Sequence, residues 1–280
     1  MNINYYNASN STRFNDGRVP YISFKSFDGL DFINHGFSTR LGGVSGGIFS
    51  SMNLSFTRGD NSDDVRTNFK IIAKALHTAP EKMVYAMQTH TANVMEATKN
   101  HCGMGVIKER DFCDVDGLVT NIPGITLVTS YADCVPLFFA DPVKKAIGLS
   151  HSGWRGTVQD IAHNTICKMQ ELYGCNPGDI KVFIGPSICR ECYEVSLDVA
   201  EKFAEKYKDE VFDNILFPKN NGKFKLDLWQ ANYRNMINSG IKEENIGITD
   251  ICTCCNKNVL FSHRASKGQR GGMCGFLTIK

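Results

Sequence analysis

The sequence predicts a single α/β domain, and three observations favour this fold class. Four stretches carry apolar residues at helical spacing, and Val65, Phe69 and Ile72 belong to the first of them. Between these stretches lie short apolar runs of strand length, such as residues 180–184. No linker rich in Gly, Pro or Ser divides the 280 residues, and no internal repeat is visible. We therefore expect the helices and strands to share one core.

Composition excludes several classes of protein. The formal net charge of +2 argues against a broad nucleic-acid-binding face, which needs clustered Lys and Arg. No apolar run approaches the ~20 residues of a membrane span. The first twelve residues lack the basic and apolar regions of a secretory signal. We expect a cytoplasmic protein whose eleven cysteines are reduced thiols, metal ligands or core residues.

The chain begins with a polar segment rich in Asn and Ser. We expect residues 1–25 to form a loosely held arm or a short edge strand, and residues 26–280 to form the domain. The next stretch, residues 33–54, contains four glycines whose backbone N–H groups can approach an anion, and Arg40 offers a guanidinium for phosphate or carboxylate. From this stretch we take Arg40, Gly42, Gly43 and Asn53 as candidate substrate-binding residues. An exposed glycine-rich turn is the alternative.

Helices are predicted where capping residues precede the apolar periodicity. Asn61 caps a helix that ends near Pro80, Ser196 caps one that reaches about residue 207, and Asp227 caps one that ends at Gly240. A fourth helix follows Gly156 and continues to about residue 173. Strands are expected at residues 83–87, 93–95, 114–120, 125–129 and 180–184. Two more are expected on either side of the basic turn at residues 264–272. This basic turn can close over a phosphate.

A β-hairpin is predicted at the centre of the chain. Two apolar runs, residues 135–140 and 146–149, flank Asp141 and Pro142, which suit a β-turn. Such a hairpin places Cys134 and His151 together at its open end. This pair admits a metal ion, a Cys–His nucleophile, or a purely structural role.

Residues near this pair widen the candidate site. His90 follows a predicted strand and would complete a catalytic zinc site, which commonly has three protein ligands and one open position. Asp116 can hydrogen-bond a ligating histidine, or can simply belong to a turn. Asp133 abuts Cys134 and is a candidate proton carrier, as is Asp116. Arg155 lies at a predicted helix N-terminus, where anions are favoured, and can serve the same anion as Arg40.

Five further cysteines require a separate interpretation. Cys189-x-x-Cys192 with Cys252-x-Cys254-Cys255 offers enough sulfur for structural zinc. We interpret only the first as a C-x-x-C pair, and Cys192 precedes what looks like the beginning of packed structure. The sequence therefore does not favour a second metal site.

Seven short motifs follow one another along the chain. They are F-S-T-R-L-G-G-V-S (37–45), Q-T-H-T-A-N-V (88–94), D-V-D-G-L-V-T (114–120), A-D-C-V-P-L (132–137), H-S-G-W-R-G (151–156), I-G-P-S-I (184–188) and C-Y-E-V (192–195). Together they resemble the YfiH-like laccase-domain family, also called the polyphenol oxidase or purine nucleoside phosphorylase family. The resemblance covers roughly residues 30–280.

The resemblance implies a fold and a metal site. The fold is a single α/β (α+β) domain with mixed β-sheets layered between helices, and the family's metal ligands correspond to His90, Cys134 and His151. The chain departs from the family pattern at Thr91, where a glycine is common, and in the tail at Ser266-Lys267 and Arg270-Gly271-Gly272.

The resemblance also implies activities. These are phosphorolysis of adenosine, inosine and methylthioadenosine, with adenosine deamination beside it. An older label implies copper-dependent phenol oxidation, and a bacterial member is linked to peptidoglycan-precursor editing.

Three enzyme hypotheses remain open from the sequence. The first is a zinc enzyme acting on a purine nucleoside and phosphate, with Cys134, His151, Asp133 and Asp116 as candidate catalytic residues. The second is a copper oxidase, because one Cys and two His also suit copper. The third is a metal-free hydrolase with Cys134 as nucleophile and His151 as base. A partner-binding module is disfavoured, since no exposed apolar repeat is visible, and the oligomeric state cannot be inferred.

Overall fold

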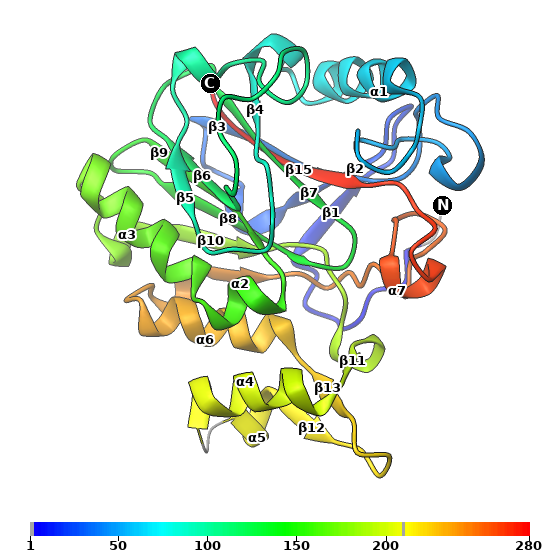
Figure 1. Cartoon of the computed structure of the whole chain (residues 1–280). Helices are drawn as coiled ribbons and strands as arrows, with labels where there is room; N and C mark the ends of the chain where they lie inside the picture. Colours follow the sequence, from blue (N-terminus) through cyan, green and yellow to red (C-terminus); the bar gives the residue numbers. More distant parts are fainter. Residues whose placement is uncertain (1–2, 209–210) are drawn as a thin grey trace.

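The protein, seen in a computed structural model, is described over residues 3–208 and 211–280 and has four layers (Figure 1). One helix, two six-stranded sheets and a group of helices follow one another. The helices of the described residues are α1 (Ser62–Ala75), α2 (Trp154–Val158), α3 (Ile161–Tyr173), α4 (Leu197–Tyr207), α5 (Val211–Asn214), α6 (Leu228–Asn238) and α7 (His263–Ser266). This is the α/β domain with layered mixed sheets that the sequence predicted.

Both large sheets are mixed. The first has the order β1 (Thr12–Asn15), β2 (Tyr21–Phe24), β3 (Ile33–Ser38), β15 (Met273–Ile279), β7 (Thr126–Tyr131) and β4 (Met83–Tyr85). The second has the order β14 (Ile246–Ile248), β10 (Lys181–Ile184), β8 (Val135–Asp141), β9 (Ala146–Ser152), β6 (Gly117–Thr120) and β5 (Val94–Glu96). The pairs β4–β7, β5–β6 and β10–β14 are parallel and the other neighbours are antiparallel.

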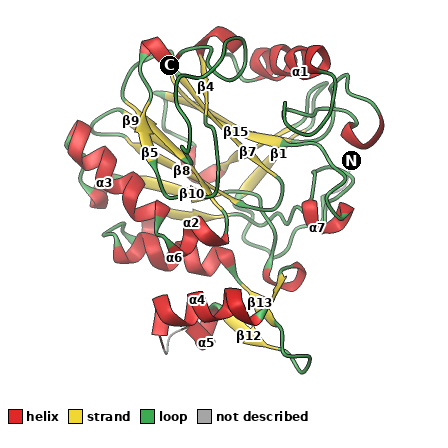
Figure 2. Cartoon of the chain, in the orientation of Figure 1, coloured by secondary structure: helices red, strands yellow, loops and turns green. Residues whose placement is uncertain are grey.

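A third, smaller sheet lies apart from these two. It consists of β11 (Glu194–Val195), β13 (Phe224–Leu226) and β12 (Leu216–Pro218), all antiparallel. Figure 2 shows β12 and β13 beside α4 and α5, below the larger sheets.

The main core lies between the two large sheets, since alternate residues of a strand face opposite sides. Phe24 of β2 stacks on Phe183 of β10 with ring centroids 4.0 Å apart, and Phe138 of β8 meets Phe24 edge-on. Each buried Phe of this kind contributes about 1.5–3 kcal/mol by leaving water. On its other face, β8 directs Leu137 and Phe139 into the layer that contains α3 and α6.

Helix α1 covers the outer face of the first sheet. Phe69 and Ile72 pack with Val128 of β7. The side chain of Asn61 accepts a hydrogen bond from Asp63 N–H at 2.8 Å and so caps the helix. The predicted helix and its cap are confirmed.

The predicted central hairpin is also confirmed. Strands β8 and β9 pair with Pro136 opposite His151. Oδ1 of Asp141 accepts the N–H groups of Val143 and Lys144 at 2.8 and 2.9 Å, which shapes the turn. Cys134 and His151 therefore lie at one end of the hairpin.

Two expectations about elements are wrong. The helix after Gly156 is broken, because Asp160 has a φ of 63° and its side chain accepts a hydrogen bond from His163 N–H, which begins a new helix, α3. The strand expected before the basic tail turn is absent from the described residues of that segment. Instead the side chain of Ser262 accepts the N–H of Ala265 at 3.1 Å and caps α7.

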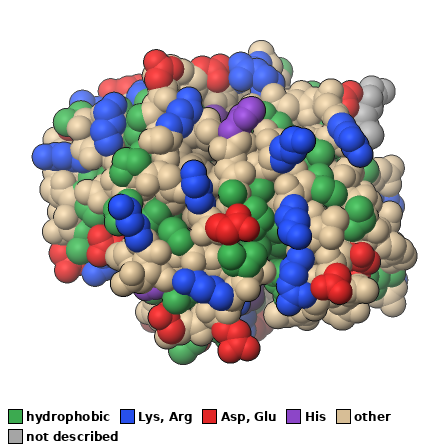
Figure 3. Space-filling model, turned by 90° about the horizontal axis from the view of Figure 1, so that it is seen from above, with side chains coloured by type: hydrophobic (Ala, Val, Ile, Leu, Met, Phe, Trp, Pro, Cys, Tyr) green, Lys and Arg blue, Asp and Glu red, His purple; other side chains and the backbone are tan. Residues whose placement is uncertain are grey.

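The expected arm at residues 1–25 contains β1 and β2, which form one end of the first sheet. This matches the edge-strand alternative for part of the segment, and the boundary at residue 26 stays a prediction. On the face seen from above, Lys and Arg side chains are scattered among Asp and Glu (Figure 3). Within residues 3–208 and 211–280, no helix is both long and apolar enough to cross a membrane.

Candidate metal centre

One edge of the second sheet gathers the residues of the candidate site. Strands β8 and β6 begin at this edge and β9 ends there, because β9 is antiparallel to both. Cys134 precedes β8, Asp116 precedes β6, and His151 lies near the end of β9. His90 lies in the connection from β4 to β5, and β5 begins at the same edge because it is parallel to β6. The topology thus brings together side chains that are far apart in the sequence.

Three metal-binding side chains converge at this edge. The nearest donor atoms of His90, Cys134 and His151 all lie within 4.8 Å of one another. His90 is exposed, Cys134 is partly exposed and His151 is buried. The two imidazole rings are nearly perpendicular, with centroids 4.9 Å apart. His90 has a φ of 67°, a rare backbone conformation for a residue other than glycine.

Asp116 holds this group together. Its Oδ1 lies 2.8 Å from Nδ1 of His151, which corresponds to the first of the two roles that the sequence left open for Asp116. The same carboxylate accepts the backbone N–H groups of Thr89, His90 and Thr91 at 3.0, 3.2 and 3.0 Å. Asp116 therefore orients His151 through its ring and His90 through the backbone of its loop.

Cys134, His151 and Asp116 stabilise the charged forms of one another. Burial alone would raise the pKa of the Cys134 thiol, but His151 and His90 lower that pKa to about 6. Burial would lower the pKa of His151, but Cys134 and Asp116 raise that pKa to about 9. Burial likewise opposes ionisation of Asp116, yet the hydrogen bond from His151 brings its pKa below the ordinary value. Cys134 is thus a thiolate near neutral pH, the form that binds metals.

The chemistry of these donors fits a metal ion that binds imidazole and thiolate, such as zinc or copper. Three protein ligands leave a fourth position open. Gly153 lies against all three side chains: an added Cβ there would come within 3.1 Å of Cδ2 of His90 and 3.2 Å of Sγ of Cys134. The glycine keeps the space beside the donor atoms open.

A cavity of about 270 Å³ opens beside the three donors. His90, Cys134 and His151 line it, as do three arginines, Arg58, Arg110 and Arg270. Nε of Arg270 is buried and has no hydrogen-bond partner among residues 3–208 and 211–280. This cationic wall is suited to an anionic ligand.

Sequence reasoning missed Arg58 and Arg110, which belong to no motif. It included Arg270 in the basic turn at residues 264–272 that can close over a phosphate, and in the departure of the tail from the family pattern, but did not assign it to the site. Arg110 donates from Nε to the carbonyl of Tyr85 at 2.6 Å, so its position is partly fixed.

The predicted substrate residues lie elsewhere. None of Arg40, Gly42, Gly43, Asn53 and Arg155 lines this cavity. The guanidinium of Arg40 donates to the carbonyls of Ser50 and Lys257 at 2.9 Å each.

The other four predicted substrate residues contact parts of the protein outside this cavity. Asn53 is buried and bonded on both sides of its amide, including to Gly272 N–H at 2.8 Å. Arg155 is exposed and lies over the ring of Trp154, and α2 at this point has only five residues. Gly42 has a φ of 85°, and Gly43 packs closely against Ser51. Their expected contact with substrate stays a prediction that this geometry does not support.

Asp133 also has other partners. Its Oδ1 accepts from Oγ1 of Thr253 at 2.6 Å, and its Oδ2 accepts from the backbone N–H of Arg264 at 2.7 Å. Its φ of 89° turns the chain directly before Cys134. Each carboxylate oxygen of Asp133 thus accepts one hydrogen bond, which holds this side chain in place directly before Cys134. Its expected role as a proton carrier stays a prediction.

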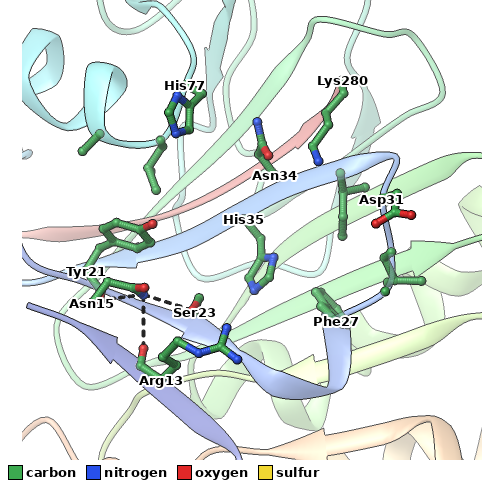
Figure 4. Close-up of a pocket in the computed structure, with 15 residues that line it drawn as sticks. Arg13, Asn15, Tyr21, Ser23, Phe27, Asp31, Asn34, His35, His77 and Lys280 are labelled. Carbon is green, nitrogen blue, oxygen red and sulfur yellow. Dashed lines mark hydrogen bonds between the residues drawn. The ribbon is translucent and has the colours of Figure 1, made fainter.

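A separate cavity of about 280 Å³ lies against β1, β2 and β3 (Figure 4). His35 and His77 line it, but none of the three candidate ligands does. Nε2 of His35 accepts the backbone N–H of Phe24 at 2.8 Å, and burial lowers the pKa of His35 to about 4. His35 is thus neutral near neutral pH.

Known proteins resemble this chain in sequence. A family model described as multi-copper polyphenol oxidoreductase laccase matches residues 34–280. The purine nucleoside phosphorylase YlmD of Bacillus subtilis is 35% identical over 246 residues, which cover 88% of each chain. The purine nucleoside phosphorylase LACC1 of Homo sapiens is 34% identical over 257 residues, which cover 89% of this chain and 56% of the human protein.

Solved structures resemble it in fold. The hypothetical protein YfiH of Bacillus licheniformis superposes with a TM-score of 0.89 at 31% identity, covering 97% of this chain and 100% of the other. YlmD of Geobacillus stearothermophilus superposes with a TM-score of 0.87 at 31% identity, covering 95% and 98% of the two chains. The family model and these relatives span nearly the whole chain, and the chain therefore belongs to the YfiH-like laccase-domain family.

Proposed function

We propose that this protein is a zinc-dependent purine nucleoside phosphorylase that cleaves adenosine, inosine or methylthioadenosine with inorganic phosphate and also deaminates adenosine. The observation that carries the proposal is the group of His90, Cys134 and His151 beside a cavity lined by three arginines. The relatives named purine nucleoside phosphorylase support the choice of reaction.

The arginines would bind phosphate. The unpartnered Nε of Arg270 is the strongest candidate, since a buried donor without an acceptor costs about 1–3 kcal/mol that a phosphate oxygen would recover. Arg58 and Arg110 line the same cavity and add positive charge. Three guanidinium groups would hold the anion in a fixed orientation toward the sugar.

The purine would contact the apolar part of the cavity wall. Phe56 and Met87 both line the cavity, and the side chain of Met87 is 43% exposed although it is apolar. A flat aromatic ligand would cover such a surface.

In phosphorolysis, a phosphate oxygen forms a bond to C1′ of the ribose while the bond from C1′ to the purine nitrogen breaks. The purine leaves with the bonding electron pair and takes up a proton, and positive charge develops on the sugar in the transition state. The arginines keep the phosphate in line with C1′ as this charge develops. When bound, a zinc ion would supply a Lewis acid to the site. Asp116 would act through His151 by accepting a hydrogen bond from Nδ1, which leaves Nε2 as the nitrogen available to a metal ion.

The experiment is incubation of the purified protein with inosine and phosphate. We expect hypoxanthine and ribose 1-phosphate from the wild type, inosine and ammonia from adenosine, and neither reaction from Cys134→Ala. The proposal is rejected if the wild type releases no hypoxanthine or if Cys134→Ala is equally active.

Two other functions have an observation in their favour. The description of the matching family model favours a copper-dependent polyphenol oxidase. Metal analysis after expression without added copper, together with oxygen uptake on a phenol, tests it. The low pKa of Cys134 beside His151 favours a metal-free hydrolase. That function would survive a strong chelator, whereas the proposed phosphorylase would be inactivated.

A further inference from the structure

Two loops at the edge of the second sheet bring four more cysteines together. Strands β10 and β14 are parallel neighbours, so their carboxyl ends meet at one edge. Cys189 and Cys192 follow β10, and Cys252 and Cys255 follow β14. The backbones of the two loops are joined at a bridge between Ser187 and Cys252.

The spacing of these cysteines corrects the interpretation made from the sequence. Cys252 and Cys255 are separated by two residues, just as Cys189 and Cys192 are. The chain therefore has two C-x-x-C pairs, the arrangement typical of structural zinc sites. The pair formed by Cys252 and Cys255 was overlooked because a third cysteine, Cys254, lies between them.

The distances fit one metal ion. The four sulfur atoms all lie within 4.8 Å of one another, and those of Cys192 and Cys255 are 3.5 Å apart. A tetrahedral zinc ion with bonds of ~2.3 Å places its sulfurs roughly 3.8 Å apart. An iron–sulfur cluster needs wider separation, because several irons and sulfides lie between its cysteines.

The backbone offers hydrogen bonds to one of the sulfurs. Sγ of Cys252 accepts the N–H of Cys189 at 3.3 Å and the N–H of Cys255 at 3.5 Å. Such donors stabilise the negative charge of a metal-bound thiolate.

We propose that Cys189, Cys192, Cys252 and Cys255 bind a structural zinc ion, distinct from the metal centre at His90, Cys134 and His151. Binding displaces the protons of the four thiols into solvent, and four thiolates leave no open position on the ion. The site is therefore structural. This proposal does not depend on the proposed function of the other centre.

The contacts around the cluster indicate what the ion would stabilise. Thr253, between the two ligands of the second loop, donates to Asp133, the neighbour of Cys134. Arg264 donates its backbone N–H to the same carboxylate and its side chain to the carbonyl of Cys192 at 3.4 Å. Fixing both cysteine loops would thus fix the chain that carries Cys134.

The test is a metal count on the full chain, purified from zinc-supplemented cells without chelators. We expect about two zinc ions per wild-type chain and about one in Cys134→Ser. That remaining ion should be lost from two double variants, Cys134→Ser/Cys192→Ser and Cys134→Ser/Cys255→Ser. Cys134→Ser/Cys254→Ser, a matched control in the same loop, should keep it. The proposal is overturned if the remaining zinc is absent from Cys134→Ser or unaffected by Cys192→Ser and Cys255→Ser.

Spectroscopy identifies the ligands. When Cys134→Ser is reconstituted with Co(II), four thiolate ligands should give intense visible and near-ultraviolet absorption that Cys192→Ser abolishes and Cys254→Ser retains. Weak absorption typical of oxygen and nitrogen ligands would contradict the proposal.

Alkylation of the cysteines in the wild-type protein tests the zinc site independently of whether the variants fold. The native protein is alkylated and each cysteine is quantified by mass spectrometry. Cys255, although exposed, should react more slowly than exposed Cys113 until a chelator is added. A disulfide between Cys192 and Cys255, released by reductant and not by chelator, would refute the zinc site.

Discussion

The carboxylate of Asp116 lies 2.8 Å from Nδ1 of His151 and also accepts three N–H groups from the loop of His90. This single contact sets which nitrogen of His151 carries a proton. With Nδ1 donating to Asp116, Nε2 is the nitrogen left to bind a metal ion beside Cys134. In the metal-free protein, where the pKa of His151 is raised to about 9, Nε2 also carries a proton near neutral pH.

Asp116→Asn should therefore weaken metal binding. An amide can donate to Nδ1 and so favour the tautomer whose Nε2 is protonated and cannot bind a metal. We expect the affinity for zinc to fall about 10- to 100-fold, measured by competition with a chromophoric chelator. Asp111→Asn, an exposed carboxylate five residues earlier, is the control and should remain near wild type. Equal affinities for wild type and Asp116→Asn would contradict this role.

Gly153→Ala should crowd the metal centre. The new Cβ would lie 3.1 Å from Cδ2 of His90 and 3.2 Å from Sγ of Cys134. Displacing these side chains costs about 1–3 kcal/mol of packing energy, so zinc retention during dialysis should fall. Gly46→Ala is the control, because its Cβ would meet nothing within 4 Å. Full zinc retention in Gly153→Ala would show that the added Cβ does not displace the side chains of His90 and Cys134.

Arg270→Gln should impair phosphate binding. Loss of a charged donor in a partly buried site should raise the KM for phosphate roughly tenfold or more while the KM for inosine changes little. Arg18→Gln, an exposed arginine outside the cavity, is the control. If Arg40→Gln or Arg155→Gln raised this KM and Arg270→Gln did not, the assignment made from the sequence would be the right one.

The metal-free protein should have an unusually reactive Cys134. A thiolate forms above the thiol's pKa, and His151 and His90 lower that pKa from 9 to about 6 despite burial. Alkylation of Cys134 after zinc removal should therefore be half-maximal near pH 6. His151→Ala removes the largest favourable charge and should shift the midpoint to higher pH. A wild-type midpoint near pH 9 would show that the ion pair does not form.

Elements governed by local chemistry were predictable. Asn61 and Asp227 cap α1 and α6 with their own side chains, and Asp141 forms the hairpin turn through two adjacent N–H groups. These contacts span only two or three residues, so the sequence specifies them directly. The break at Asp160 escaped prediction because apolar periodicity continues across it.

Part of the site was predictable for a related reason. Cys134 directly precedes β8, and His151 lies on β9, which pairs with β8. Their proximity therefore follows from one hairpin. His90 came from the zinc ligand rule and from the family motifs. By contrast, Arg58, Arg110 and Arg270 meet only through the packing of distant loops.

Helices α1 and α6, the central hairpin and the three candidate ligands could be predicted from the sequence, because short-range hydrogen bonds and motif spacing encode them. The tertiary structure alone decided which arginines line the cavity and that Cys189 and Cys192 meet Cys252 and Cys255. The physical reason is strand pairing: β10 and β14 lie side by side in parallel although more than sixty residues separate them, and no local pattern records that register.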